Sequence, residues 1–315
     1  MRGLRVFSAT LMAVVVAACG GGGGSQSAPP GGPAPPRTPQ QAASMPMTLA
    51  IPIRKQNSRA RRPRFVSPGL QSVALYDSNL LVWVANVSLG QFTTVYAAPG
   101  SATTVTPGVC TILPTTETCT VNLTSISGQH TFDLVAYPVQ QSATPPACNN
   151  DVCPPIGFNG VISSEGELNV VLNGGPNPPA ILTMLGVASN AEINGGTTAV
   201  GLAYNTPTPI GYQILDSAAA QITTPGNYDN GPVTWAASPS GVLTIDQTSN
   251  STPPSAPGDQ PLIVTCTNTA GGAATVTVSA NSSPNTFYSS GIVYSSSNYW
   301  GGGALATLNV TCNPM

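Results

Sequence analysis

Short runs in which apolar and polar residues alternate recur through most of the chain, and they constrain the fold more than any other feature. Residues 119–124 read CTVNLT, with apolar residues at odd positions and polar residues at even ones. Alternating residues face opposite sides of a strand, whereas a helix repeats apolar residues every three or four positions. Similar runs occur at residues 130–137, 168–172, 262–266, 274–278 and 306–310. The pattern predicts an all-β protein built of antiparallel sandwiches in which each sheet buries one face.

Glycine and proline separate these runs and suggest how the chain is divided. The sequence holds 33 glycines and 32 prolines, and pairs such as Pro99-Gly100 and Pro225-Gly226 are typical of turns. Residues 174–179 read GGPNPP, which can continue neither a helix nor a β-ladder. We therefore expect two tandem sandwich domains, at residues 46–173 and 180–315, with residues 174–179 as their linker.

The N-terminal segment has the three parts of a secretory signal. Arg2 and Arg5 supply positive charge, residues 6–16 are apolar, and small residues follow them. The tetrapeptide Val16-Ala17-Ala18-Cys19 resembles the lipobox of bacterial lipoproteins. This resemblance implies that residues 1–18 are a signal peptide and that Cys19 carries a lipid anchor. The alternative is an ordinary signal peptide with an incidental cysteine.

Residues 19–45 are predicted to be a disordered tether between the lipid and the body of the protein. They contain the run Gly20–Gly24 and a stretch rich in Pro, Ser and Gln, which cannot bury enough apolar surface to offset the entropy of ordering. Gly20 is not an acid, so the resemblance to lipoproteins also implies an outer-membrane or cell-surface location in a bacterial envelope.

Positive charge is confined to the first part of the chain. All nine basic residues lie at or before Arg64, and all eleven acids lie after it. Six of the nine form what we call the basic tract, which consists of Arg54, Lys55, Arg59, Arg61, Arg62 and Arg64. The tract is predicted to contact anionic envelope lipid or polysaccharide, and a solvated loop is an equally good interpretation. Nucleic acid is not an expected partner, because the body lacks the cations that neutralise phosphates.

Seven cysteines leave an even number for disulfides once Cys19 is assigned to lipid. Among the possible pairings we favour the local one, which joins Cys110 to Cys119, Cys148 to Cys153 and Cys266 to Cys312. The last two share the phase of inward-facing valines in their strands. A metal site is the alternative, but the sequence lacks paired CxxC elements and has one histidine. We therefore expect neither a metal nor a cofactor.

The segments RRPRFVSP at residues 61–68, Cys110, CTV at residues 119–121 and GQHTFDLVAY at residues 128–137 resemble the immunoglobulin-like modules of poorly characterised bacterial envelope proteins. The resemblance implies a sandwich fold and a surface setting, and it supplies no catalytic residues. The second predicted domain is similar only in its pattern. Its Trp235 precedes both Cys266 and Cys312, whereas antibody domains place the tryptophan between the cysteines.

Few residues are suited to catalysis. His130 is the only histidine, and Asp133, three residues later, is expected on the opposite face of the strand. A distant serine and aspartate could still converge on His130, although a strand-edge histidine is the commoner case. Glu165 and Glu167 share a face, as the paired carboxylates of glycoside hydrolases do, but the serines and glycine around them favour a solvated turn.

Aromatic residues near the C-terminus are candidates for stacking on a sugar or on a protein partner, with core filling as the alternative. They are Tyr288, Tyr294, Tyr299 and Trp300.

These observations favour a non-enzymatic, lipid-anchored envelope protein that uses immunoglobulin-like modules for structural or adhesive binding. The alternative is an envelope enzyme that acts on polysaccharide, or its carbohydrate-binding accessory domain. A cleft that gathers His130, or Glu165 and Glu167 with other acids, would favour the enzyme, whereas dispersed groups would favour binding.

Overall fold

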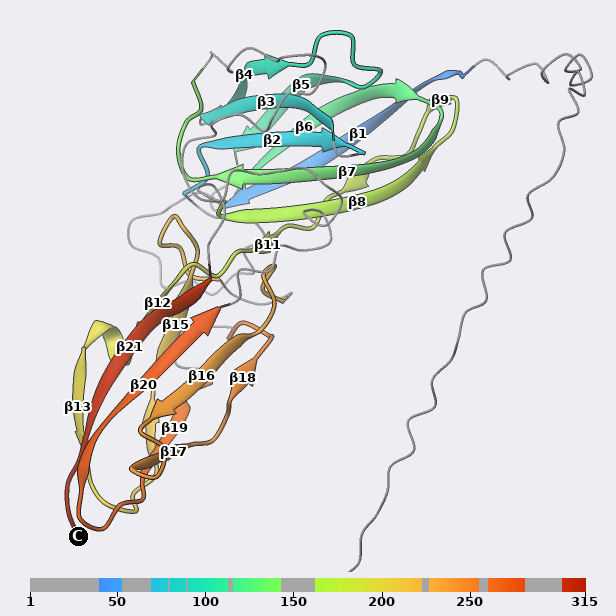
Figure 1. Cartoon of the computed structure of the whole chain (residues 1–315). Coiled ribbons are helices and arrows are strands. Elements are labelled where there is room, and N and C mark those ends of the chain that lie inside the picture. The colour runs from blue at the N-terminus through green and yellow to red at the C-terminus, as the bar shows by residue number, and fades with distance from the viewer. Residues whose placement is uncertain are drawn as a thin grey trace, which may run out of the picture. The chain divides into compact units, whose positions relative to one another are not determined.

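A computed structural model describes residues 40–52, 69–78, 80–88, 90–112, 116–142, 162–222, 227–254, 260–280 and 302–315 (Figure 1). Apart from one 3-10 turn, η1 (Asn194–Gly196), the regular structure of these residues consists of β-strands. The predicted all-β class is therefore confirmed. Among the residues described, no helix has the length and apolar character needed to cross a bilayer.

The N-terminal strands form two sheets. One sheet has the order β10 (Ala180–Ile181), β1 (Ala42–Pro52), β6 (Thr116–Ile126) and β5 (Thr104–Ile112), and β9 (Gly175–Pro176) also pairs with β1. The other has the order β11 (Leu185–Gly186), β8 (Ser164–Leu172), β7 (Gly128–Tyr137), β2 (Ser72–Asp77), β3 (Leu80–Ser88) and β4 (Gln91–Ala97). Neighbouring strands are antiparallel except that β9 and β10 run parallel to β1. We call these two sheets together the first sandwich.

The alternation seen in the sequence accounts for the core of the first sandwich. Met45 and Met47 of β1 pack in one cluster with Leu75 of β2 and with Phe132 and Leu134 of β7, so the cluster draws on both sheets. The next residues along these strands point the other way, as the period of two requires. On the outer face of the second sheet they form a smaller cluster that includes Tyr76, Val135 and Tyr137.

Part of the predicted linker and the first residues of the predicted second domain are paired with strands of the first sandwich. β9 and β10 lie beside β1, and Leu185 of β11 pairs with Glu165 of β8. Asn177 reinforces this pairing, because its backbone N–H donates to the Ser44 carbonyl at 2.7 Å. The core clusters change from the first sandwich to the next at Val187 and Ala188. Residues Gln40–Met315 nevertheless group as one compact unit, so a division into two domains stays a prediction.

The C-terminal strands form three further sheets. The largest has the order β13 (Ala199–Leu202), β21 (Gly303–Cys312), β20 (Gly272–Ala280), β16 (Val233–Ser238) and β18 (Ser249–Asn250), with β13 parallel to β21. A second has the order β14 (Thr208–Ile210), β19 (Leu262–Cys266) and β17 (Leu243–Ile245). A third joins β12 (Asn190–Ile193) to β15 (Tyr212–Leu215).

A single core cluster joins these three sheets, which we call the second sandwich. It includes Ile193, Val264, Val276 and Val310, so each sheet contributes to it. Trp235 is also part of this core, and its ring meets that of Tyr212 edge-on with centroids 4.6 Å apart.

Candidate functional site

The single histidine lies inside the first sandwich, where it belongs to a buried polar network. Its Nδ1 is 2.8 Å from Asp77 Oδ2, and its Nε2 is 2.9 Å from the Ile126 carbonyl. The His130 ring also stacks on Phe132, with centroids 5.4 Å apart and planes 3° from parallel. Because each ring nitrogen already faces an oxygen, neither is available to activate a nucleophile or to bind a metal.

The same network connects the two sheets of the first sandwich. Asp77 ends β2 and His130 lies in β7, whereas Thr103 directly precedes β5 and Ser125 lies in β6. The Thr103 hydroxyl donates to Asp77 Oδ2, and its oxygen is 2.6 Å from Ser125 Oγ. All four residues are buried. Buried polar groups are costly when unpaired, so this set of bonds stabilises one arrangement of the sheets.

A distant aspartate therefore does converge on His130, although the result is not a catalytic triad. The hydroxyls of Thr103 and Ser125 lie on the Asp77 side of the ring, whereas a nucleophile would have to sit at Nε2. The backbone carbonyl of Ile126 occupies that position. The sequence interpretation of a strand-edge histidine is wrong, because β7 lies between β8 and β2 and the side chain faces the interior.

Three acids lie on the opposite, outer face of the second sheet. Asp133 of β7 is the register partner of Glu167 of β8, and Val135 is the partner of Glu165. Asp133 is fully buried, and among the described residues neither of its carboxyl oxygens has a hydrogen-bond partner. Burial, followed by the negative charge of Glu167, raises the pKa of Asp133 from its ordinary value of 3.8 to about 7. At neutral pH a substantial fraction of Asp133 therefore carries a proton.

The prediction of a solvated turn at Glu165 and Glu167 is wrong. β8 begins at Ser164 and pairs with β7 along its length, while β11 pairs with its first residues. Glu165 is consequently buried, whereas Glu167 is exposed and accepts a hydrogen bond from the Asn169 side chain. Serine and glycine misled the sequence interpretation, because small residues suit a covered strand as well as a turn.

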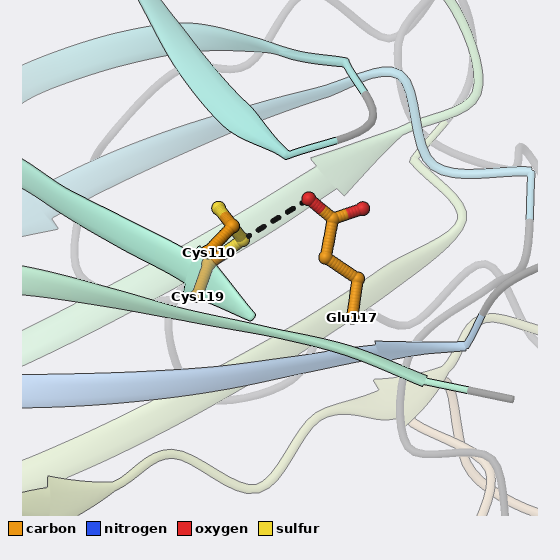
Figure 2. A group of neighbouring side chains, drawn as sticks. All are labelled: Cys110, Glu117 and Cys119. Atoms are coloured by element: carbon orange, nitrogen blue, oxygen red, sulfur yellow. Dashed lines mark hydrogen bonds between the residues drawn. A yellow bond between two sulfur atoms is a disulfide. The ribbon is translucent and has the colours of Figure 1, made fainter. Parts of the chain in front are cut away.

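A third group of reactive side chains lies where β5 meets β6, and Figure 2 shows its members together. Cys110 and Cys119 are register partners joined by a disulfide, with Cα atoms 4.0 Å apart. Glu117 precedes Cys119 by two residues and therefore shares its face of β6. Its carboxylate is buried and accepts the Gly90 backbone N–H at 2.6 Å. The sequence interpretation missed Glu117, although its spacing from Cys119 placed the two on one face.

A second disulfide joins Cys266 of β19 to Cys312 of β21, with Cα atoms 5.6 Å apart. β19 and β21 belong to different sheets of the second sandwich, so this bond links the sheets directly. Both cysteines are buried, as the phase of their strands predicts. Two of the three disulfides expected from the sequence are thus present.

The other residues singled out in the sequence lie outside the described residues. They are Cys19, the basic tract, Cys148, Cys153 and the aromatic group Tyr288, Tyr294, Tyr299 and Trp300.

No protein-family model matches the sequence, and no curated protein shows significant sequence similarity to it. Two solved structures resemble the fold. One contains the fibronectin(III)-like modules of CbhA from Clostridium thermocellum, at 10% identity and a TM-score of 0.22 over 85% of each chain. The other contains domains 4 and 5 of the S-layer protein SbsC, at 11% identity and a TM-score of 0.23 over 76% of this chain and 96% of that one. At these identities and TM-scores, neither likeness bears on what this chain does.

Proposed function

We propose that this chain is a non-enzymatic, lipid-anchored envelope protein whose sandwiches serve structural or adhesive binding. One observation carries the non-enzymatic part. The candidate catalytic groups are divided between the two faces of β7 and β8, with His130 inside the sandwich and Glu165 and Glu167 outside it. Catalysis needs such groups within hydrogen-bonding reach of one substrate, and a sheet separates these.

The anchor is supported by the sequence, through the lipobox-like tetrapeptide that ends at Cys19. In bacterial cells that express the wild-type chain, we expect lipid label on the protein and recovery in the membrane fraction. A Cys19→Ser variant should lose the label and leave that fraction. A Cys266→Ser variant is the matched control and should keep the label, since its cysteine is buried within the second sandwich. Unchanged labelling of the Cys19→Ser protein would show that the anchor is misassigned.

Action on envelope polysaccharide is the second candidate, and one observation favours it. Asp133 retains a proton near neutral pH opposite the exposed Glu167, and a proton-bearing carboxyl beside a second carboxylate is the arrangement that glycoside hydrolysis uses. The burial of Asp133 counts against this function, because a general acid must reach the oxygen that it protonates.

The two functions differ in a direct assay. When the soluble Cys19→Ser protein is incubated with purified envelope polysaccharide, we expect no release of new reducing ends, whether or not the protein binds the polysaccharide. Release that disappears in both Asp133→Asn and Glu167→Gln variants, and persists in Glu192→Gln, would replace the binding function with the enzymatic one. Glu192 is a suitable control because it is an exposed acid on β12, in the second sandwich.

A further inference from the structure

We propose that Cys110, Cys119 and Glu117 form a zinc site when the disulfide between the two cysteines is reduced. The inference is independent of the lipid anchor and of the binding role. It concerns a cluster in which two sulfurs and a carboxylate oxygen all lie within 4.8 Å of one another.

The spacing of the three groups suits a tetrahedral ion. Zinc lies about 2.3 Å from a cysteine sulfur and about 2.1 Å from a carboxylate oxygen, which places neighbouring ligands about 3.6 Å apart. Glu117 Oε1 is 3.6 Å from Cys119 Sγ in the present, oxidised state. Cys110 and Cys119 face each other across a strand pair, so opening the disulfide needs rotation of side chains and no movement of the backbone register. A water molecule would complete the four ligands, as at open zinc sites.

The chemistry of the oxidised state leaves Glu117 with few partners. The contact drawn between Glu117 and Cys119 in Figure 2 joins a carboxylate to a disulfide sulfur, which has no proton to donate. Among the described residues, the hydrogen bond from Gly90 is the one strong interaction of the Glu117 carboxylate. All lysines and arginines of the chain lie at or before Arg64, outside the described residues, and His130 is paired with Asp77. Within the described part of the chain, a metal ion is therefore the class of cation that would neutralise this buried carboxylate.

The donor set selects the metal. Two thiolates favour zinc over calcium or magnesium, which prefer oxygen ligands only. The other described disulfide, Cys266–Cys312, provides an internal comparison, because no carboxylate of the described residues forms such a group with its sulfurs.

Cys110 and Cys119 are buried, so a reductant reaches their disulfide through local opening of the strand that carries Cys110. β5 is the last strand of its sheet, and its pairing with β6 shifts register between Pro107 and Cys110. Val109, within this bulge, is 80% exposed. Gly108 permits the close approach of the strands there, since a Cβ at this position would lie 2.7 Å from the Thr120 carbonyl oxygen.

Two chemical steps convert the disulfide into the zinc site, and each conserves atoms and electrons. A dithiol reductant attacks one sulfur, the S–S bond breaks with its electron pair on the other cysteine, and the reductant closes its own disulfide. The chain then holds two thiols. Zinc binding displaces one proton from each thiol to solvent and joins both thiolates to the Glu117 carboxylate.

Cobalt substitution tests the proposal on the full-length Cys19→Ser chain after reduction with a phosphine. We expect one equivalent of Co²⁺ to bind with thiolate-to-metal absorption bands, and zinc to displace it. The oxidised chain should show no such bands. Removing both sulfurs, in Cys110→Ser/Cys119→Ser, should abolish them, whereas Cys266→Ser/Cys312→Ser should retain them. All these proteins also carry Cys148→Ser and Cys153→Ser, so that these two cysteines contribute no thiolate to the bands.

The carboxylate is tested by Glu117→Gln, whose amide oxygen can still accept the Gly90 N–H. This variant should bind zinc at least about tenfold more weakly, because a neutral amide replaces an anionic ligand. The exposed Glu192→Gln is the matched control and should bind as the parent chain does. The proposal is overturned if the double serine variant binds cobalt equally well or if Glu117→Gln leaves the zinc affinity unchanged. It is also overturned if thiol labelling finds Cys110 and Cys119 reduced only under conditions in which the circular-dichroism signal of the β-sheets is lost.

Discussion

The buried Asp133 of the first sandwich should make the stability of the protein depend on pH. Its pKa is raised in the folded protein, so folding favours the protonated carboxyl. Its contribution to stability is complete below the ordinary pKa of 3.8 and is lost as pH rises through about 7. As pH rises from about 4 to about 8, the free energy of unfolding, measured in urea, should fall less for Asp133→Asn than for the parent chain. Glu192→Gln is the control, and an unchanged pH dependence in Asp133→Asn would contradict the assignment.

At the same scale, Asp77 is expected to act with His130 as a pair. Asp77 accepts hydrogen bonds from His130, from Thr103 and from Ser78. Asp77→Ala should lower the free energy of unfolding by about 3 kcal/mol, because it leaves a buried imidazole without its partner. A double-mutant cycle of Asp77→Asn and His130→Gln should give a coupling energy above about 1 kcal/mol. Additive effects of the two substitutions would show that the pair makes no joint contribution.

At the scale of strands and sheets, the two described disulfides should differ in what they stabilise. Cys266–Cys312 closes 46 residues and joins two sheets, whereas Cys110–Cys119 closes 9 residues within one sheet. Loop-closure entropy predicts that removing the first pair costs about 4 kcal/mol and removing the second about 2.6 kcal/mol. Paired Cys→Ala variants, unfolded in urea without reductant, measure both. A larger loss from the Cys110 and Cys119 variant would mean that local packing outweighs chain entropy.

At the scale of the whole molecule, the separation of charge predicts how the protein meets its surroundings. Trypsin cuts after lysine and arginine, and none occurs after Arg64, so native protein cut within the basic tract should leave a large fragment that begins at or before Phe65. If trypsin cuts the basic tract of the native protein, the tract is exposed to solvent. The Cys19→Ser form should then bind anionic vesicles, and added salt should release it by screening the charges. A charge-free variant of the tract is the control. Protection from trypsin together with no salt-sensitive binding would reduce the tract to a structural loop.

The sequence by itself determined the fold class and the facing of the strands whose residues alternate clearly. Alternation at residues 262–266 and 306–310 matches β19 and β21, and it correctly predicts that Cys266 and Cys312 face inward. It also correctly predicts that Asp133 and His130 face opposite sides of β7. These properties follow from the period of two, which is local and can be counted along the chain.

Strand pairing was decided in three dimensions, and the candidate sites depend on it. Asp77 and His130 are 53 positions apart, and Gly90 meets Glu117 from another strand connection. The same holds for β9, from the expected linker, and for β10, from the start of the expected second domain, which both pair with β1. It holds too for β11, which pairs with β8 at Glu165. Alternation places residues on a face but does not say which strand becomes a neighbour or in what register. That choice depends on how the apolar faces of all the strands bury one another together.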